Sequence, residues 1–132
     1  MDRRLSGGLL DTSVLMAADA SAVTLPAVAA ISVVTLGELH AGVLIAQETW
    51  IRELRRQRLD AVRAAFAPLP VDEPVAERYG ELLAFARLHG WTEKATDLLI
   101  IATAAASNRT LYTLDNRQAE LASAARVAVE SV

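Results

Sequence analysis

The sequence predicts an α/β protein in which helices cover both faces of a parallel sheet, giving a three-layer α/β/α domain. Short apolar runs rich in β-branched residues alternate along the chain with longer segments of helical spacing. Such alternation is typical of right-handed βαβ units. The short runs are apolar throughout, so both faces of each strand must be covered by other elements. The length of 132 residues predicts one domain over 1–132.

The predicted strands are short and buried. Residues 30–34 (AISVV) are the clearest case, because they are β-branched and apolar without interruption. Residues 69–71 contain a proline and suit the edge of a sheet. In chain order, the expected strands are 9–10, 30–34, 69–71, 110–114 and 127–129.

The expected helices separate these strands. Residues 48–66 place their apolar side chains on one stripe at helical spacing, and Pro68 follows as a helix breaker. Pro74 suits the first turn of the next helix, and Gly90 suits its end. In chain order, the expected helices are 12–20, a segment that begins at Thr35, 48–66, 74–88, 96–106 and 118–124.

Composition excludes several classes of protein. Hydrophobic residues make up 53% of the chain and charged residues 22%, which excludes a disordered chain. With no cysteine and only two histidines, neither a disulfide scaffold nor a zinc site is expected. No apolar run approaches the roughly 18 residues of a membrane span, and Asp11 interrupts the N-terminal apolar stretch too early for a signal peptide. We therefore expect a soluble, cytoplasmic protein with no membrane contact.

Four carboxylates interrupt apolar segments. Asp11 directly follows the first strand, and Asp115 follows the strand 110–114. Glu38 falls in the first turn of the helix after the second strand, and Asp97 in the first turn of the helix before 110–114. In an open parallel sheet, the carboxyl ends of the strands and the starts of the following helices share one edge, where ligands bind. The place of Asp97 depends on the loop before its helix, whereas the other three acids map to that edge directly.

Each carboxylate also has a purely structural explanation. Asp11 and Asp115 suit helix caps. Glu38 completes a capping box with Thr35, and Asp97 gains from the dipole of its helix. We favour a shared functional site over four separate caps, because the four acids converge on one edge.

A divalent cation would explain why four carboxylates gather. Like charges at close range repel unless a cation lies among them. Oxygen ligands without histidine or cysteine favour Mg²⁺ or Mn²⁺ over Zn²⁺, and such ions suit hydrolysis of phosphodiester bonds. The formal net charge of −3 becomes +1 when the four acids are set aside, so it does not exclude a nucleic-acid substrate.

The order of these residues resembles the PIN-domain nuclease pattern, and within it the VapC-type toxins of bacterial toxin–antitoxin pairs. The matching stretches are LLDTSVLMA, ISVVTLGELHAGV and ATDLLIIATAAASNRTLYTLDNRQAEL, and only 47–72 carries little signal. By this resemblance Asp11, Glu38, Asp97 and Asp115 take the family's acidic catalytic and metal-binding positions.

The resemblance further implies a sheet of five parallel strands, a homodimer, Mg²⁺- or Mn²⁺-dependent cleavage of RNA, and a cognate antitoxin of the VapB type. Ser13 and Thr113 match the small hydroxyl residues that support the acids. Asn116 is a candidate for orienting a water or a phosphate, or for a turn. The sequence departs from the family pattern at 116–118 (NRQ), which lacks the aromatic residue often seen there.

Two other functions stay open. A PIN-like module that only binds RNA or protein would be expected to have lost an acid, and none is missing. A DNA nuclease of this general fold usually carries an added helical arch, for which this chain has no room. The arginines within 52–63 form either a solvated face paired with neighbouring acids or a rim that contacts RNA phosphates.

Overall fold

A computed structural model describes residues 7–17 and 25–132, and within them five parallel strands form one sheet. The strand order is β3-β2-β1-β4-β5. Neighbouring strands pair in register, for example Leu9 with Ala30 and Leu9 with Leu111. The strands are β1 (Gly8–Leu10), β2 (Ala29–Ser32), β3 (Pro68–Leu69), β4 (Thr110–Thr113) and β5 (Val129–Ser131). The predicted α/β class and five-stranded parallel sheet are confirmed.

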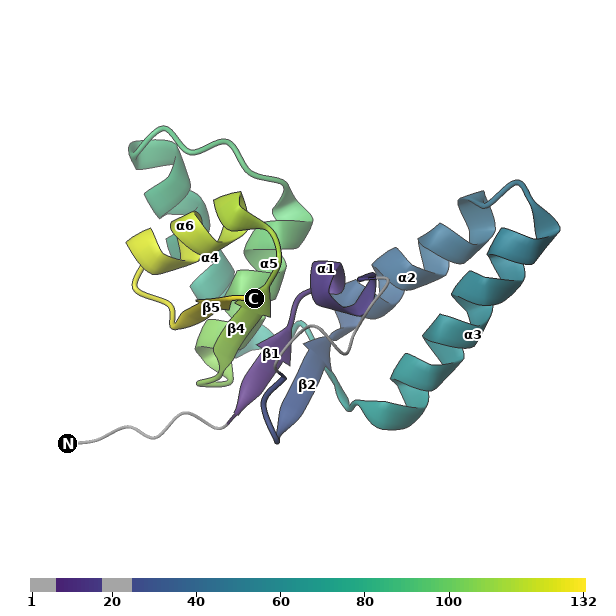
Figure 1. Ribbon diagram of the computed structural model, residues 1–132. Coiled ribbons are helices and arrows are strands. Elements are labelled where there is room, and N and C mark those ends of the chain that lie inside the picture. The colour runs from purple at the N-terminus through teal and green to yellow at the C-terminus, as the bar shows by residue number, and fades with distance from the viewer. Residues whose placement is uncertain (1–6, 18–24) are drawn as a thin grey trace.

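Helices cover both faces of the sheet, which confirms the three-layer arrangement. In Figure 1, α2 and α3 run side by side on one side of the sheet, and α4, α5 and α6 lie on the other. The helices are α1 (Thr12–Leu15), α2 (Val33–Ile45), α3 (Thr49–Ala65), α4 (Glu73–Leu88), α5 (Ala95–Ala106) and α6 (Asn116–Ala124). None of the helices in 7–17 and 25–132 is long and apolar enough to cross a lipid bilayer.

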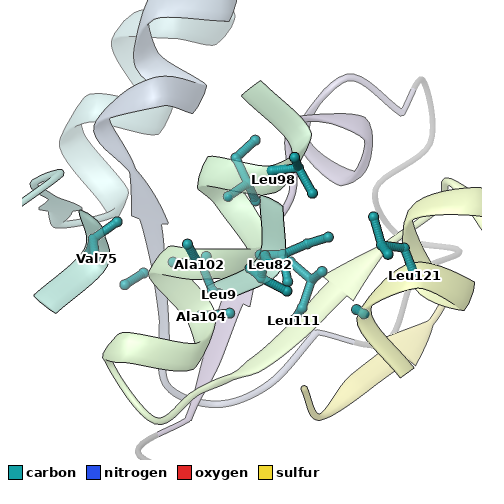
Figure 2. Close-up of a cluster of buried hydrophobic side chains, with 12 residues drawn as sticks. Leu9, Val75, Leu82, Leu98, Ala102, Ala104, Leu111 and Leu121 are labelled. Carbon is teal, nitrogen blue, oxygen red and sulfur yellow. The ribbon is translucent and has the colours of Figure 1, made fainter. Parts of the chain in front are cut away.

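Successive residues of one strand feed two separate cores. Leu9 packs with α4 and α5 side chains such as Leu82 and Leu98, as Figure 2 shows. Leu10 points to the opposite face and packs with Leu39 and other residues of α2 and α3. Both leucines are fully buried. This is why the central strand β1 is apolar throughout, since neither of its faces meets water.

Several predicted boundaries differ from the structure. The second strand ends at Ser32 instead of 34, because the buried Ser32 hydroxyl accepts a hydrogen bond from the backbone N–H of Val34 and starts α2 there. The edge strand β3 begins one residue early, at Pro68. The last strand begins two residues late, because Arg126 takes a φ of 64° and closes the end of α6. The first helix ends at Leu15, and the last residues of the predicted 12–20 segment (18–20) lie outside the described residues.

The arginines of α3 do not form the predicted face of paired charges. Among the residues that the structure describes, the only ion pairs are Arg78–Glu81 and Arg117–Glu93, and neither involves α3. Arg52 donates instead to the carbonyl oxygen of Ala46 at 2.7 Å, and Arg55 donates to that of Gly42 at 2.7 Å. These carbonyls belong to the C-terminal turn of α2, where the last carbonyl groups of a helix have no backbone N–H partner within the helix. The two arginines therefore supply the missing hydrogen-bond donors at that end of α2.

Candidate active site

The four predicted carboxylates lie at the ends of elements that meet at the carboxyl edge of the sheet. Asp11 follows β1 and Asp115 follows β4. Glu38 is the sixth residue of α2, so it lies in the second turn and not in the predicted first. Asp97 is the third residue of α5, which runs back toward the start of β4 and therefore begins at this same edge.

Asp11 is held by a network of hydroxyl groups. Its side chain is only 4% exposed. Its Oδ2 accepts hydrogen bonds from Ser13 Oγ at 2.6 Å, from Thr113 Oγ1 at 3.0 Å and from the backbone N–H of Ser13 at 3.3 Å. All three bonds use the same oxygen, which leaves Oδ1 outside this network. The structure thus places Ser13 and Thr113 directly against Asp11, and Asp11 also caps α1.

Glu38 is tied to the turn that follows Asp11. Its Oε1 accepts a hydrogen bond of 2.6 Å from Thr12 Oγ1. The same hydroxyl lies 3.1 Å from Oγ1 of the buried Thr35. The predicted capping box of Thr35 and Glu38 is therefore wrong, because α2 begins three residues earlier and Ser32 caps it. Nothing in the sequence pattern indicated Thr12 as the hydrogen-bond donor to Glu38.

Asp115 is exposed and caps α6. Its Oδ1 accepts from the backbone N–H groups of Arg117 at 3.0 Å and Gln118 at 3.2 Å. The structural explanation for this acid is thus correct, and it leaves Oδ2 outside the cap. Asn116 is exposed as well, and its Oδ1 accepts from Ser131 Oγ at 3.3 Å. The Asn116 side chain therefore joins α6 to β5 and makes no direct bond to the acids.

Asp97 is the carboxylate whose pKa is shifted by the other acids. The pKa of Asp97 is raised from 3.8 to about 6, first by burial and then by the neighbouring carboxylates of Asp11, Asp115, Glu38 and Glu93, in that order. No described residue donates a hydrogen bond to its carboxylate. Burial and the three other predicted acids therefore all disfavour the ionised form of Asp97.

Glu93 is a fifth acid near the site, and no feature of the sequence pattern distinguishes it. Its side chain is 6% exposed and forms an ion pair with Arg117. Arg117 also donates to the carbonyl oxygen of Thr92 at 3.3 Å, and its guanidinium lies 5.7 Å from the ring centre of Trp91. Arg117 thereby fastens the loop before α5 to the start of α6. The sequence holds no periodic signal for this contact, because Glu93 lies in a loop 24 residues from its partner.

The donor chemistry of the site fits a hard divalent cation, because every candidate ligand is a carboxylate oxygen. The mutual repulsion at Asp97 is also what a bound cation would relieve. In residues 7–17 and 25–132, however, no three Asp, Glu or His side chains are arranged around one ion position. The carboxylates would have to turn toward an ion when it binds.

Comparison with known proteins defines the class of fold. The family model of the PIN domain matches residues 8–124. This chain therefore belongs to the PIN-domain family.

Individual relatives are similar to this protein over most of its length. Ribonuclease VapC5 of Mycobacterium tuberculosis (strain ATCC 25618 / H37Rv) is 36% identical over 128 residues, covering 94% of both chains. Ribonuclease VapC8 of M. tuberculosis (strain CDC 1551 / Oshkosh) is 41% identical over 101 residues, covering 74% of this chain and 89% of its own. A crystal structure of VapBC-5, a member of the VapBC family of toxin–antitoxin systems from M. tuberculosis, matches with a TM-score of 0.86 and 38% identity. The match covers 96% of this chain and 99% of that one.

Proposed function

We propose that this protein is a Mg²⁺- or Mn²⁺-dependent endoribonuclease and the toxin of a toxin–antitoxin pair. The observation that carries the proposal is the convergence of Asp11, Glu38, Asp97 and Asp115 on one edge of the sheet, where burial and the neighbouring carboxylates raise the pKa of Asp97. Membership of the PIN-domain family supports it, as do relatives named ribonucleases and a similar structure from a toxin–antitoxin system.

In this proposal Asp11, Glu38 and Asp97 hold the cation, and Asp115 assists the cation or a water. When bound, Mg²⁺ or Mn²⁺ supplies an activated water and positive charge for the phosphodiester group. Asp11 would bind the cation through Oδ1, since hydroxyls hold its Oδ2 in place. The hydrogen bond from Thr12 fixes Glu38 in the same way.

The arginines of α3 are suitable contacts for the RNA backbone. Arg55 and Arg58 line a small pocket together with Glu38. Guanidinium groups next to a carboxylate edge would bind phosphates that flank the bond to be cut, since arginine recognises phosphate through paired donors. This favours the RNA-contacting rim over a purely solvated face.

The test is cleavage of a mixed pool of structured RNAs by the purified protein. Parallel reactions contain Mn²⁺, Mg²⁺ or EDTA, and the variant Asp97→Asn runs beside the wild type. The proposal predicts cuts that require the metal and disappear in the variant. Equal cutting by Asp97→Asn, or cutting that survives EDTA, would refute it.

The toxin role implies a protein partner, and we propose a VapB-type antitoxin and a homodimeric toxin. The similarity to VapBC-5 supports the antitoxin.

Light scattering on the isolated protein should give a mass near twice 14.1 kDa if the toxin is a homodimer. Expression of the chain alone should arrest growth of the host, and Asp97→Asn should not.

A module that binds RNA or protein without cutting is the second candidate. It is favoured by the lack, in the described residues, of three carboxylates already arranged around one ion. Calorimetric titration with Mn²⁺ separates the two functions, because the nuclease must bind the ion and the silent module need not.

A further inference from the structure

Gln118 is a fully buried polar residue beside the candidate site. It lies in the first turn of α6, where its side chain is 0% exposed. The carboxamide oxygen Oε1 lies 2.8 Å from Thr113 Oγ1. Its nitrogen Nε2 is buried and has no hydrogen-bond partner among the described residues. A buried amide nitrogen without a partner is costly, so this arrangement needs a physical reason.

The Thr113 hydroxyl cannot satisfy all the neighbours that this orientation gives it. Its oxygen lies 3.0 Å from Asp11 Oδ2 and 2.8 Å from Gln118 Oε1, and both of these atoms are acceptors. A third oxygen, Ser13 Oγ, lies 3.3 Å away, but the hydrogen of that hydroxyl goes to Asp11 Oδ2. A hydroxyl has only one hydrogen to donate. If that hydrogen goes to Gln118, Thr113 Oγ1 and Asp11 Oδ2 face each other with no hydrogen between them.

Turning the Gln118 carboxamide by half a turn removes the conflict at Thr113 and moves the carboxamide oxygen, in place of the nitrogen, to the buried position where Nε2 has no partner. The two ends of a carboxamide have nearly the same shape, so Nε2 then occupies the position 2.8 Å from Thr113. Thr113 Oγ1 accepts from Gln118 and from the backbone N–H of Asp115, which lies 3.0 Å away, and donates to Asp11. One donated and two accepted bonds are the full capacity of a hydroxyl.

We propose that Gln118 is a positioning residue for the nuclease site: its Nε2 donates to Thr113, which directs the Thr113 hydroxyl hydrogen onto Asp11 Oδ2. Hydrogen bonds then connect three groups in sequence: the Gln118 amide in the first turn of α6, the Thr113 hydroxyl and the Asp11 carboxylate. It holds Oδ2 of Asp11 and leaves Oδ1 for the cation. This inference rests on the proposed function, because it gives Gln118 a role in how Asp11 meets the metal.

The experiment is a double-mutant cycle between Gln118 and Thr113. Gln118→Met keeps the size of the side chain and removes its donor, and Thr113→Val removes the hydroxyl. Gln57→Met makes the same change on the exposed face of α3 and serves as the control. For each protein, calorimetry measures Mn²⁺ affinity, RNA cleavage gives kcat and KM separately, and urea unfolding measures stability.

Gln118→Met should weaken Mn²⁺ binding and lower kcat roughly 10-fold, with KM for RNA unchanged, as for other groups that orient a metal ligand. In the Thr113→Val background the same change should have less than a roughly 2-fold effect, because the relay is already broken. Gln57→Met should match the wild type. If Gln118→Met does not fold, Gln118→Leu takes its place in the cycle.

Two results would overturn the inference. Wild-type affinity and kcat in Gln118→Met would show that the amide has no influence on Asp11. Equal losses with and without the Thr113 hydroxyl would show that Gln118 only contributes to packing. A wild-type protein that neither binds Mn²⁺ nor cuts RNA would instead refute the proposed function, and this inference with it.

Discussion

The starts of α1 and α5 each present an aspartate to the same edge of the sheet, but in opposite surroundings. Asp11, before α1, is almost completely buried and accepts three hydrogen bonds on Oδ2. Asp97, in the first turn of α5, receives no hydrogen bond from the described residues. Burial and four neighbouring carboxylates raise its pKa to about 6.

The difference between the two aspartates shows how one site can contain both a charge that the folded protein stabilises and a charge that a cation would stabilise. Hydroxyl and backbone donors stabilise a buried negative charge without any ion. An acid without such donors destabilises the folded protein when it ionises, until a cation neutralises the repulsion. Asp11 thus belongs to the folded framework, whereas Asp97 is the acid whose charge would depend most on the proposed metal.

The largest expected effect is on activity, where the two acids should behave alike. Asp97→Asn and Asp11→Asn should each lower RNA cleavage roughly 100-fold or more, because each removes a proposed metal ligand. Cleavage rates at saturating Mn²⁺ test this. Asp72→Asn is the matched control, since Asp72 caps α4 and lies outside the acid cluster. Near-normal activity in either site variant would remove that residue from the site.

Metal binding should stabilise the wild type and have little effect on Asp97→Asn. A ligand at about 100 times its Kd stabilises a protein by about 2.7 kcal/mol. Urea unfolding with and without Mg²⁺ measures the difference between the two proteins. An equal gain in both would show that the ion binds elsewhere.

In the absence of metal, the two substitutions should change stability in opposite directions at pH 7.5. Asp97→Asn removes repulsion and should raise the free energy of unfolding by about 1 kcal/mol, after a reduction for solvent screening. Asp11→Asn weakens charge-assisted hydrogen bonds and should lower that free energy by about 1 kcal/mol. The same unfolding experiment in EDTA measures both. Changes of the same sign would contradict the contrast between the two acids.

The pH dependence of stability should show a smaller contribution from Asp97. Its folded pKa of about 6 lies above the ordinary value of 3.8, so between these values the folded protein holds a proton that the unfolded chain has released. Its contribution is therefore fully present below about pH 4 and is lost as the pH rises through about 6. The stability of the wild type minus that of Asp97→Asn should decline across this window in EDTA. A constant difference would exclude the raised pKa.

Much of the fold follows from the sequence because its signals are local. Uninterrupted apolar runs such as 30–34 indicate covered strands, and Pro74 lies in the first turn of α4 as expected. The boundaries that failed depend on single side chains. Ser32 caps α2 and ends β2 early although Val33 and Val34 are β-branched, because a satisfied helix start outweighs β propensity.

The acids of the candidate site were predictable, and their supports only in part. Asp11, Glu38, Asp97 and Asp115 interrupt apolar segments at positions that the topology brings to one edge. The bond from Thr12 to Glu38 spans 26 residues, and the pairing of Arg117 with Glu93 spans 24. Such contacts have no periodic signal, because they depend on how elements pack and not on spacing within one element.

The most direct test of the account is the titration of the Asp97 carboxyl group, followed by its ¹³C chemical shift with and without Mg²⁺. Without the ion, we expect a pKa of about 6, raised by burial and by the neighbouring acids. With saturating Mg²⁺, that pKa should fall below the ordinary value of 3.8, because the cation favours the ionised form. A pKa near 3.8 that Mg²⁺ leaves unchanged would contradict both the coupling of the four acids and their role in binding metal.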